Sequence, residues 1–236
     1  MPSNSAIATL VGLIALVLAV FGIWPGIDLA VSGFFYDTSH ALVVQNAFLL
    51  PPIVEILRNF FWDVSLLVPL AALILLALSL WVRRSVLALS ARAWGFVLAL
   101  FLLGPGLVVN GILKAYWGRA RPHNVVDFGG TAQFTPAYQI SDQCAANCSF
   151  VSGEGAGATA VTITALLILF AFRNRLPKLG YILGQGLALA MLGFVGWQRV
   201  ASGGHFLSDV LLSVLIVSLI AAILARFMLN HDSPSR

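Results

Sequence analysis

Six long apolar runs alternate with shorter polar segments along the chain. They cover residues of about 6–23, 64–82, 93–113, 157–172, 180–197 and 209–226. A membrane-crossing α-helix needs about 20 predominantly apolar residues, and the runs are close to this length. The pattern predicts an all-α, polytopic membrane protein with six transmembrane helices. We interpret residues 1–236 as one integral-membrane domain.

The composition supports this reading. Hydrophobic residues make up 60% of the chain and charged residues 9%, and the mean hydropathy is +0.96. These values lie outside the range of soluble globular domains. No basic residue precedes the first run and no convincing cleavage site follows it, so we expect a permanent helix there rather than a signal peptide.

Basic residues gather in the connections on one side of the predicted membrane. They are Arg83, Arg84, Arg92, Arg173, Arg175, Lys178, Arg226 and Arg236. Cytoplasmic loops of membrane proteins carry an excess of Lys and Arg. We therefore expect this side and both termini to be cytoplasmic, and the long loops to be external. The net charge of +4 reflects this asymmetry and gives no reason to expect nucleic-acid binding.

A first polar cluster follows the third apolar run on the predicted external side. Lys114, Arg119 and Arg121 lie within eight residues there, against the charge bias of the other connections. An anionic ligand would explain them, because Lys and Arg neutralise phosphate oxygens well. The alternative is that the side chains reach lipid headgroups, and we favour this alternative for Arg119.

A second cluster, Ser152, Gly153 and Glu154, precedes the fourth run. A helix that begins there would present backbone N–H groups to an anion. The small residues of this segment also suit close helix packing, which is the alternative. Beside a bound phosphate an ionised Glu154 would be repelled. It either carries a proton and serves as an acid, or points away within the first helical turn.

A third cluster, Arg199, His205 and Asp209, lies between the last two runs. If the last helix begins at His205, Asp209 is one turn further on and within reach of the imidazole. A carboxylate there would orient the ring and make its other nitrogen a better nucleophile or base. The guanidinium of Arg199 suits phosphate oxygens. The alternative is a set of interfacial residues that cap a membrane helix.

Both cysteines, Cys144 and Cys148, belong to a polar external loop of residues 123–150. In an oxidising compartment this pair favours a disulfide, with free thiols or a metal site as alternatives. The loop is too long for a simple connection, so we expect a lid or a specificity wall.

Other polar residues show no spacing that demands chemistry. We interpret Asp28, Asp37 and His40 as solvated loop residues, and residues 52–62 as a short amphipathic helix at the interface. His231 and Asp232 are expected to lie in a disordered tail.

The first and third clusters resemble the signature of the type 2 phosphatidic acid phosphatase (PAP2) superfamily. The family's first block is Lys, six residues and Arg-Pro, which Lys114 to Pro122 match. Its third block is Ser-Arg, five residues, His, three residues and Asp. Arg199, His205 and Asp209 keep this spacing, and Gln198 stands where the family usually has Ser.

The second cluster departs from the family pattern. The usual block is Pro-Ser-Gly-His, and here it is Val151, Ser152, Gly153 and Glu154. The histidine usually credited with protonating the leaving group is therefore absent, whereas the phosphate pocket is not affected.

Within the superfamily, several further segments are most similar to the bacterial lipid A 4'-phosphatases. They are FFYD, GPGLVVN, YWGRARP, QCAANCSFVSGE and GGHFLSDV. The resemblance implies removal of the 4'-phosphate of lipid A through a phosphohistidine, at the periplasmic face of the bacterial inner membrane.

The resemblance also implies roles for individual residues. His205 would attack phosphorus while Asp209 holds its ring, and Glu154 would protonate the departing oxygen or orient the hydrolytic water. His123 is a second candidate acid. The phosphoryl oxygens would be bound by Lys114, Arg121, Ser152, Gly153 and Arg199. A lipid phosphate in the bilayer is the expected partner, with no metal, other cofactor or obligate protein partner.

Other functions remain as alternatives. The same pocket would serve a different lipid phosphate or pyrophosphate, or transfer of phosphate to a second lipid. A transporter would place ionisable residues near the middle of its helices, where we find essentially none. A non-catalytic binder of anionic lipids is conceivable because of Glu154, but phosphate binding alone requires no histidine oriented by an acid.

Overall fold

In the computed structural model described here, helices are the only regular secondary structure among residues 4–36 and 50–229, which are the residues that the structure describes. Asp37, His40, His231, Asp232 and Arg236 lie outside them. The elements are α1 (Asn4–Ile23), α2 (Gly26–Gly33), α4 (Leu50–Val82), α5 (Ala91–Phe101), η1 (Leu102–Leu113), α6 (Lys114–Tyr116), η2 (Pro122–Asn124), η3 (Val126–Phe128), α7 (Gly153–Phe172), α8 (Lys178–Ala201) and α9 (Leu207–Met228).

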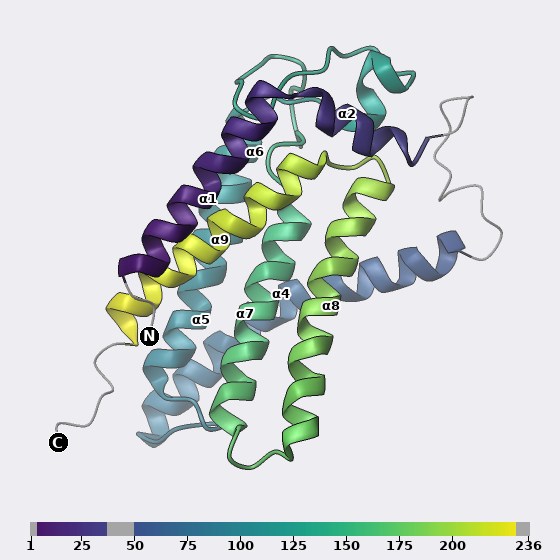
Figure 1. Cartoon of the computed structure of the whole chain (residues 1–236). Helices are drawn as coiled ribbons and strands as arrows, with labels where there is room; N and C mark the ends of the chain where they lie inside the picture. The colour runs from purple at the N-terminus through teal and green to yellow at the C-terminus, as the bar shows by residue number, and fades with distance from the viewer. Residues whose placement is uncertain (1–3, 37–49, 230–236) are drawn as a thin grey trace.

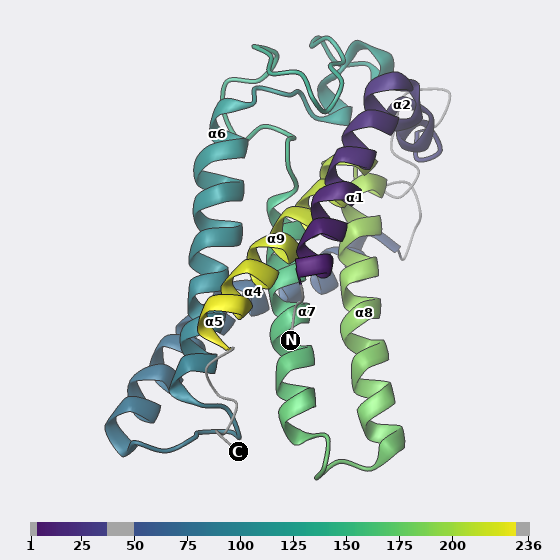
Figure 2. The same ribbon diagram turned by 60° about the vertical axis from the view of Figure 1, so that its left-hand side comes forward.

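Six segments are long and apolar enough to cross a membrane: α1, α4, the run from α5 to α6, α7, α8 and α9. Figure 2 shows α5, η1 and α6 as one continuous rod that rises to the large loop. The predicted all-α architecture with six apolar helices is confirmed. The bounds of the second helix differ from the prediction. Residues 52–62 form no separate interfacial helix, because α4 runs without a break from Leu50 to Val82.

Helix α7 is the centre of the bundle and contacts α4, α5, η1, α8 and α9 (Figure 1). Small residues at its start let neighbouring helices approach closely. A Cβ at Gly153 would lie 2.7 Å from Oδ1 of Asn110 in η1, and one at Gly155 would lie 2.6 Å from Oγ of Ser213 in α9. These small residues therefore serve helix packing, as the alternative interpretation expected, and packing does not exclude a role in ligand binding.

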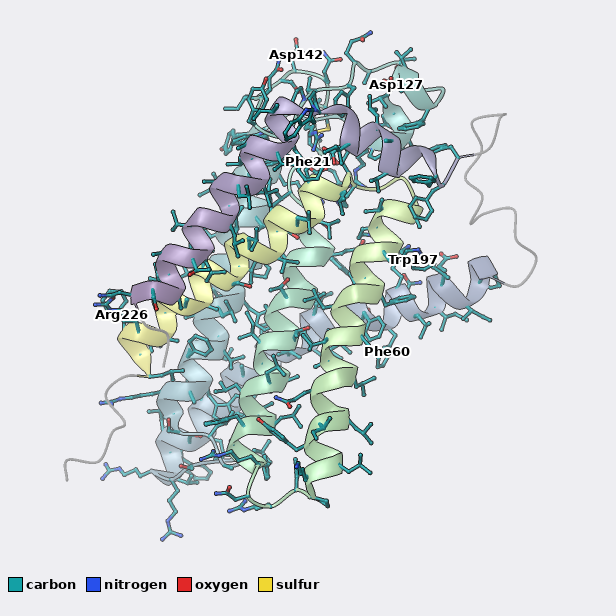
Figure 3. All side chains as sticks on the ribbon, viewed as in Figure 1. Phe21, Phe60, Asp127, Asp142, Trp197 and Arg226 are labelled. Atoms are coloured by element: carbon teal, nitrogen blue, oxygen red, sulfur yellow. A yellow bond between two sulfur atoms is a disulfide. The ribbon has the colours of Figure 1, made fainter. Side chains whose placement is uncertain are left out.

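The two ends of the bundle differ in charge. The connections at one end carry Arg83, Arg84, Arg173 and Arg175. The other end carries α2 and the loop between α6 and α7. Figure 3 labels Asp127 and Asp142 at that end, and Arg226 well away from it. The clusters singled out from the sequence all lie toward the loop end.

Candidate active site

A cavity of about 320 Å³ opens beneath the loop between α6 and α7. Four cations and one carboxylate line it, together with a histidine, three asparagines, a tryptophan and a glycine. The lining residues are Arg58, Asn59, Trp62, Asn110, Lys114, Arg121, Asn147, Gly153, Glu154, Arg199 and His205. A concave site with this excess of positive charge is suited to an anion.

His205 enters the cavity from the turn between α8 and α9. The carbonyl of Arg199 ends α8 by accepting hydrogen bonds from the N–H groups of Gly204 (3.1 Å) and His205 (3.0 Å). Gly203 has a φ of +64°, and a Cβ there would collide with the hydroxyl of Tyr36. Glycine at this position therefore allows the tight turn that places the imidazole.

The hydrogen bonds of His205 fix its tautomer. Nδ1 lies 2.7 Å from the carbonyl oxygen of Ser149. A carbonyl only accepts, so Nδ1 carries the proton and Nε2 keeps a lone pair. Burial, reinforced by the charges of Arg121, Lys114 and Arg199, holds the pKa of His205 well below its ordinary value of 6.5. The ring is therefore neutral at physiological pH, which leaves Nε2 available as a nucleophile.

Asp209 does not reach His205, and the predicted contact is wrong. The last helix begins at Leu207 rather than at His205, so the expected one-turn spacing does not apply. The carboxylate turns back to the N–H of Phe206 (3.1 Å) and accepts a hydrogen bond from the hydroxyl of Ser149 (2.5 Å). Asp209 is thus linked to the imidazole only through Ser149, whose hydroxyl it binds and whose carbonyl accepts from the ring.

Arg119 and Asp28 are buried partners, which corrects both predictions made for them. Arg119 is fully buried, and its guanidinium binds Asp28 at 2.8 Å and Asp209 at 2.7 Å. The plane of Phe206 covers it at 4.3 Å. Asp28 also accepts hydrogen bonds from the N–H (2.9 Å) and hydroxyl (2.5 Å) of Ser208. Arg119 therefore joins α2 to the start of α9, rather than reaching headgroups.

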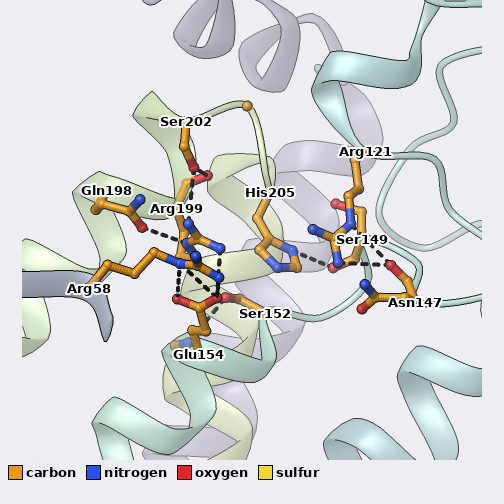
Figure 4. Close-up of polar contacts among 12 residues, drawn as sticks. Arg58, Arg121, Asn147, Ser149, Ser152, Glu154, Gln198, Arg199, Ser202 and His205 are labelled. Carbon is orange, nitrogen blue, oxygen red and sulfur yellow. Dashed lines mark hydrogen bonds and ion pairs between the residues drawn. The ribbon is translucent and has the colours of Figure 1, made fainter. Parts of the chain in front are cut away.

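Glu154 points into the cavity from the first turn of α7. It binds Nη1 of Arg199 at 2.7 Å, and it binds Arg58 through Nη2 (2.7 Å) and Nε (3.1 Å). Figure 4 shows the carboxylate against both guanidinium groups, with His205 between Arg199 and Arg121. Glu154 lies in the first helical turn but does not point away, and its oxygens accept from two cations; its role as an acid stays a prediction.

Lys114 and Arg121 approach the cavity from the segment after α5. Lys114 directly follows the π-helical stretch η1, which contains Pro105. Within this stretch the side chain of Asn110 donates a hydrogen bond of 2.7 Å to the carbonyl of Pro105. Arg121 donates two hydrogen bonds, of 3.0 and 2.9 Å, to the carbonyl of Asn147. That carbonyl belongs to the short loop closed by the disulfide between Cys144 and Cys148. The large loop thus holds a cation in place.

Gly153 and Ser152 are placed differently from each other. Gly153 lines the cavity, as expected for a phosphate-binding backbone. Ser152 is buried and is the N-cap of α7, where its hydroxyl accepts from the N–H of Gly155 at 3.1 Å. Ser152 does not line the cavity, and neither does His123, which bonds to the carbonyl of Gly203 at 2.8 Å.

Sequence reasoning missed the contribution of α4 to the cavity. Arg58, Asn59 and Trp62 come from the segment that we interpreted as an interfacial helix. Arg58 is the only arginine of this segment and was the available signal, but nothing local to it points to Glu154, which lies 96 residues further along the chain.

The link from Asp209 through Ser149 to the imidazole predicts the effect of Ser149→Ala. The substitution keeps the carbonyl that holds Nδ1 but removes the hydroxyl that bonds to Asp209. We expect kcat of the reaction at this site to fall by about tenfold, the equivalent of one hydrogen bond to a charged group, with KM little changed. Ser141→Ala, which removes a hydroxyl bonded to the carbonyl of Gly118 in the same loop, is the control. Equal effects of the two substitutions would contradict the link.

Comparison with known proteins identifies the family. Residues 92–233 match the sequence model of the PAP2 superfamily. The chain is 32% identical over 201 residues to a lipid A 4'-phosphatase of Francisella tularensis subsp. novicida (strain U112), covering 84% of each chain. It is 33% identical over 209 residues to a lipid A 4'-phosphatase of Rhizobium leguminosarum, covering 84% of this chain and 85% of the relative.

A solved structure shows the same fold. The crystal structure of a transmembrane PAP2 type phosphatidylglycerolphosphate phosphatase from Bacillus subtilis superposes with a TM-score of 0.59 and 20% sequence identity. The match covers 97% of this chain and 98% of that one. Fold, family match and the identity to two relatives agree, and this chain belongs to the PAP2 superfamily.

Proposed function

We propose that this protein hydrolyses the 4'-phosphate ester of lipid A, with His205 as the nucleophile. The observation that carries the proposal is the imidazole itself. Its Nδ1–H is held by the Ser149 carbonyl, and the ring lines a cavity whose other walls include Lys114, Arg121 and Arg199. The lipid A 4'-phosphatases that resemble the chain over 84% of its length support the choice of substrate.

The reaction takes place in two steps. In the first, the Nε2 lone pair attacks phosphorus, the bond from phosphorus to the ester oxygen breaks, and the released lipid alcohol gains a proton from water. In the second, a water molecule attacks the phosphohistidine and passes one proton to the hydroxide left by the first step, the P–N bond breaks, and hydrogen phosphate leaves with Nε2 restored. The Nδ1 proton stays on the ring throughout and remains donated to the carbonyl oxygen of Ser149.

Charge stabilisation comes from the cations around the imidazole. Lys114, Arg121 and Arg199 neutralise the phosphoryl oxygens as negative charge redistributes in the transition state, together with the backbone N–H of Gly153. Asp209 fixes the Ser149 segment, and Ser152 caps the helix that carries Gly153. Glu154 orients Arg199 rather than delivering a proton, because two guanidinium groups already occupy its oxygens.

We propose that the reaction takes place at the outer, periplasmic side of the bacterial inner membrane. The connection that carries Arg83 and Arg84 and the one that carries Arg173 and Arg175 lie at the end of the bundle opposite the cavity. Basic connections favour the cytoplasm. A periplasmic site is also consistent with the disulfide between Cys144 and Cys148, because that compartment is oxidising.

Mass spectrometry of lipid A from a Gram-negative host that expresses the chain tests the proposal. We expect loss of one phosphate, from the 4' position, with the unmodified protein and not with His205→Ala. Unchanged lipid A in cells whose membranes contain the intact protein would contradict the substrate. Loss of the phosphate with both proteins would contradict the nucleophile.

A further inference from the structure

One wall of the cavity comes from outside the part of the chain that matches the family model. Arg58, Asn59 and Trp62, here called the α4 wall, line the cavity from the N-terminal half of α4. The match to the PAP2 superfamily begins only at residue 92. The cations of the family signature and the histidine lie within the match, and the α4 wall lines the same cavity from outside it.

The α4 wall is fixed to the phosphate site by an ion pair. Arg58 meets Glu154 through two of its nitrogens, and Glu154 directly follows Gly153 in the first turn of α7. The side chains of this pair are 36% and 15% exposed, so the bond is partly shielded from water. Phe61, next along α4, contacts Phe194 of α8 with 5.7 Å between ring centres. The helix segment that carries the α4 wall is thus held against α7 and α8.

Among the described residues, the remaining polar groups of the α4 wall have no hydrogen-bond partner. Within the described ranges, the carboxamide of Asn59 and the indole N–H of Trp62 form no hydrogen bond, and Trp62 is 44% exposed. Nη1 of Arg58 is likewise left over once Nε and Nη2 have bonded to Glu154. An aromatic face, an amide and a guanidinium N–H therefore face the same cavity without partners in the fold.

This combination of groups matches a sugar ring better than a glycerol chain. A pyranose has an apolar C–H face that packs on an aromatic plane, and a rim of hydroxyl and amide groups that pair with planar polar side chains. A phosphoryl group fills only part of a 320 Å³ cavity, so room remains for the group that carries it. A diacylglycerol phosphate offers a flexible three-carbon chain with no ring face to the indole.

We propose that the α4 wall is the headgroup subsite of this enzyme, and that it selects phosphate esters carried on a sugar ring. Trp62 stacks on the ring, while Asn59 and Arg58 bind its polar rim. Glu154 takes part indirectly, as the positioning residue that holds Arg58 beside the phosphate site. The inference rests on the proposed function and names the part of the cavity that decides between classes of lipid phosphate.

Binding measured without turnover tests the subsite. In the His205→Ala background, dissociation constants are measured in detergent micelles for lipid A carrying the 4'-phosphate and for dioleoyl phosphatidic acid. We expect the parent to prefer the glycolipid. Trp62→Ala and Asn59→Ala should each weaken glycolipid binding by about tenfold while changing phosphatidic acid binding by less than about threefold, because only the ring contacts are lost.

Phe60→Ala is the matched control, because Phe60 is 57% exposed on the same helix and does not line the cavity. It should leave both affinities unchanged. Equal affinity of the parent for the two lipids, or equal weakening of both by Trp62→Ala, would overturn the subsite. Turnover of lipid A by the protein with His205 intact is measured separately. A preference for binding without turnover would overturn the proposed function but not the subsite.

Discussion

Replacement of His205 by asparagine is expected to reduce phosphate release by about 10⁴-fold or more, the scale seen when a catalytic nucleophile is removed. The asparagine amide still offers an N–H to the carbonyl of Ser149, which holds Nδ1 in the native protein at 2.7 Å. It lacks any atom equivalent to the Nε2 lone pair. The substitution therefore removes the nucleophile while preserving the contact that positions the side chain.

Trapping of the phosphoenzyme provides the measurement. Protein mixed with substrate labelled in its phosphate is quenched within milliseconds, and the labelled bond is tested for the acid lability and alkali stability of a phosphohistidine. Label is expected in the native protein and in Ser141→Ala, which alters a hydroxyl bonded to Gly118 outside the cavity. Label or turnover that survives in His205→Asn would show that another group attacks phosphorus.

The pH dependence follows from the same environment. The pKa of His205 is held well below 6.5 by burial and by the nearby cations. At pH 6.5 an ordinary imidazole is half protonated. The imidazole of His205 stays neutral and nucleophilic at that pH. Phosphoenzyme formation at pH 6.5 is therefore expected to match that at pH 7.5 closely.

The helices could be predicted from the sequence because apolar length determines them. Hydropathy is a local property, and all six predicted spans correspond to long helices. The start of α4 was missed for a physical reason. Glu55, Arg58 and Asp63 end the apolar run, but Glu and Arg are good helix formers, so the helix extends beyond the apolar run.

The site residues that could be predicted are those whose spacing along the chain indicates their function. Lys114, Arg121, Arg199 and His205 line one cavity, as their pattern indicated. Partners distant in sequence were not predictable. The contact of Arg119 with Asp28 spans 91 residues and that of Arg58 with Glu154 spans 96. No local spacing encodes such pairs, which depend on how the helices pack.

Arg119→Met is expected to destabilise the protein more than other substitutions of its arginines. Arg119 is fully buried and neutralises both Asp28 and Asp209. Methionine fills part of the volume but leaves two buried carboxylates without their cation. Breaking a buried ion pair in this way costs about 3–5 kcal/mol, because the remaining charge is desolvated and unpaired. For a chain of this length the loss corresponds to a fall in Tm on the order of 10 °C.

Thermal unfolding of the detergent-solubilised protein measures this cost, with Arg84→Met as the control. Arg84 is exposed at the opposite end of the bundle, so its replacement should shift Tm by no more than about 2 °C, as for an ordinary surface substitution. Adding Asp28→Asn to Arg119→Met removes one of the stranded charges and should restore part of the lost stability. If Arg119→Met matches Arg84→Met, the guanidinium is not needed to compensate the two carboxylates. If Asp28→Asn gives no recovery, the loss arises from packing rather than from charge. Partial recovery would show that the charges of Arg119, Asp28 and Asp209 contribute to joining α2 and α9. The same cluster holds Asp209 against Ser149, whose carbonyl positions His205.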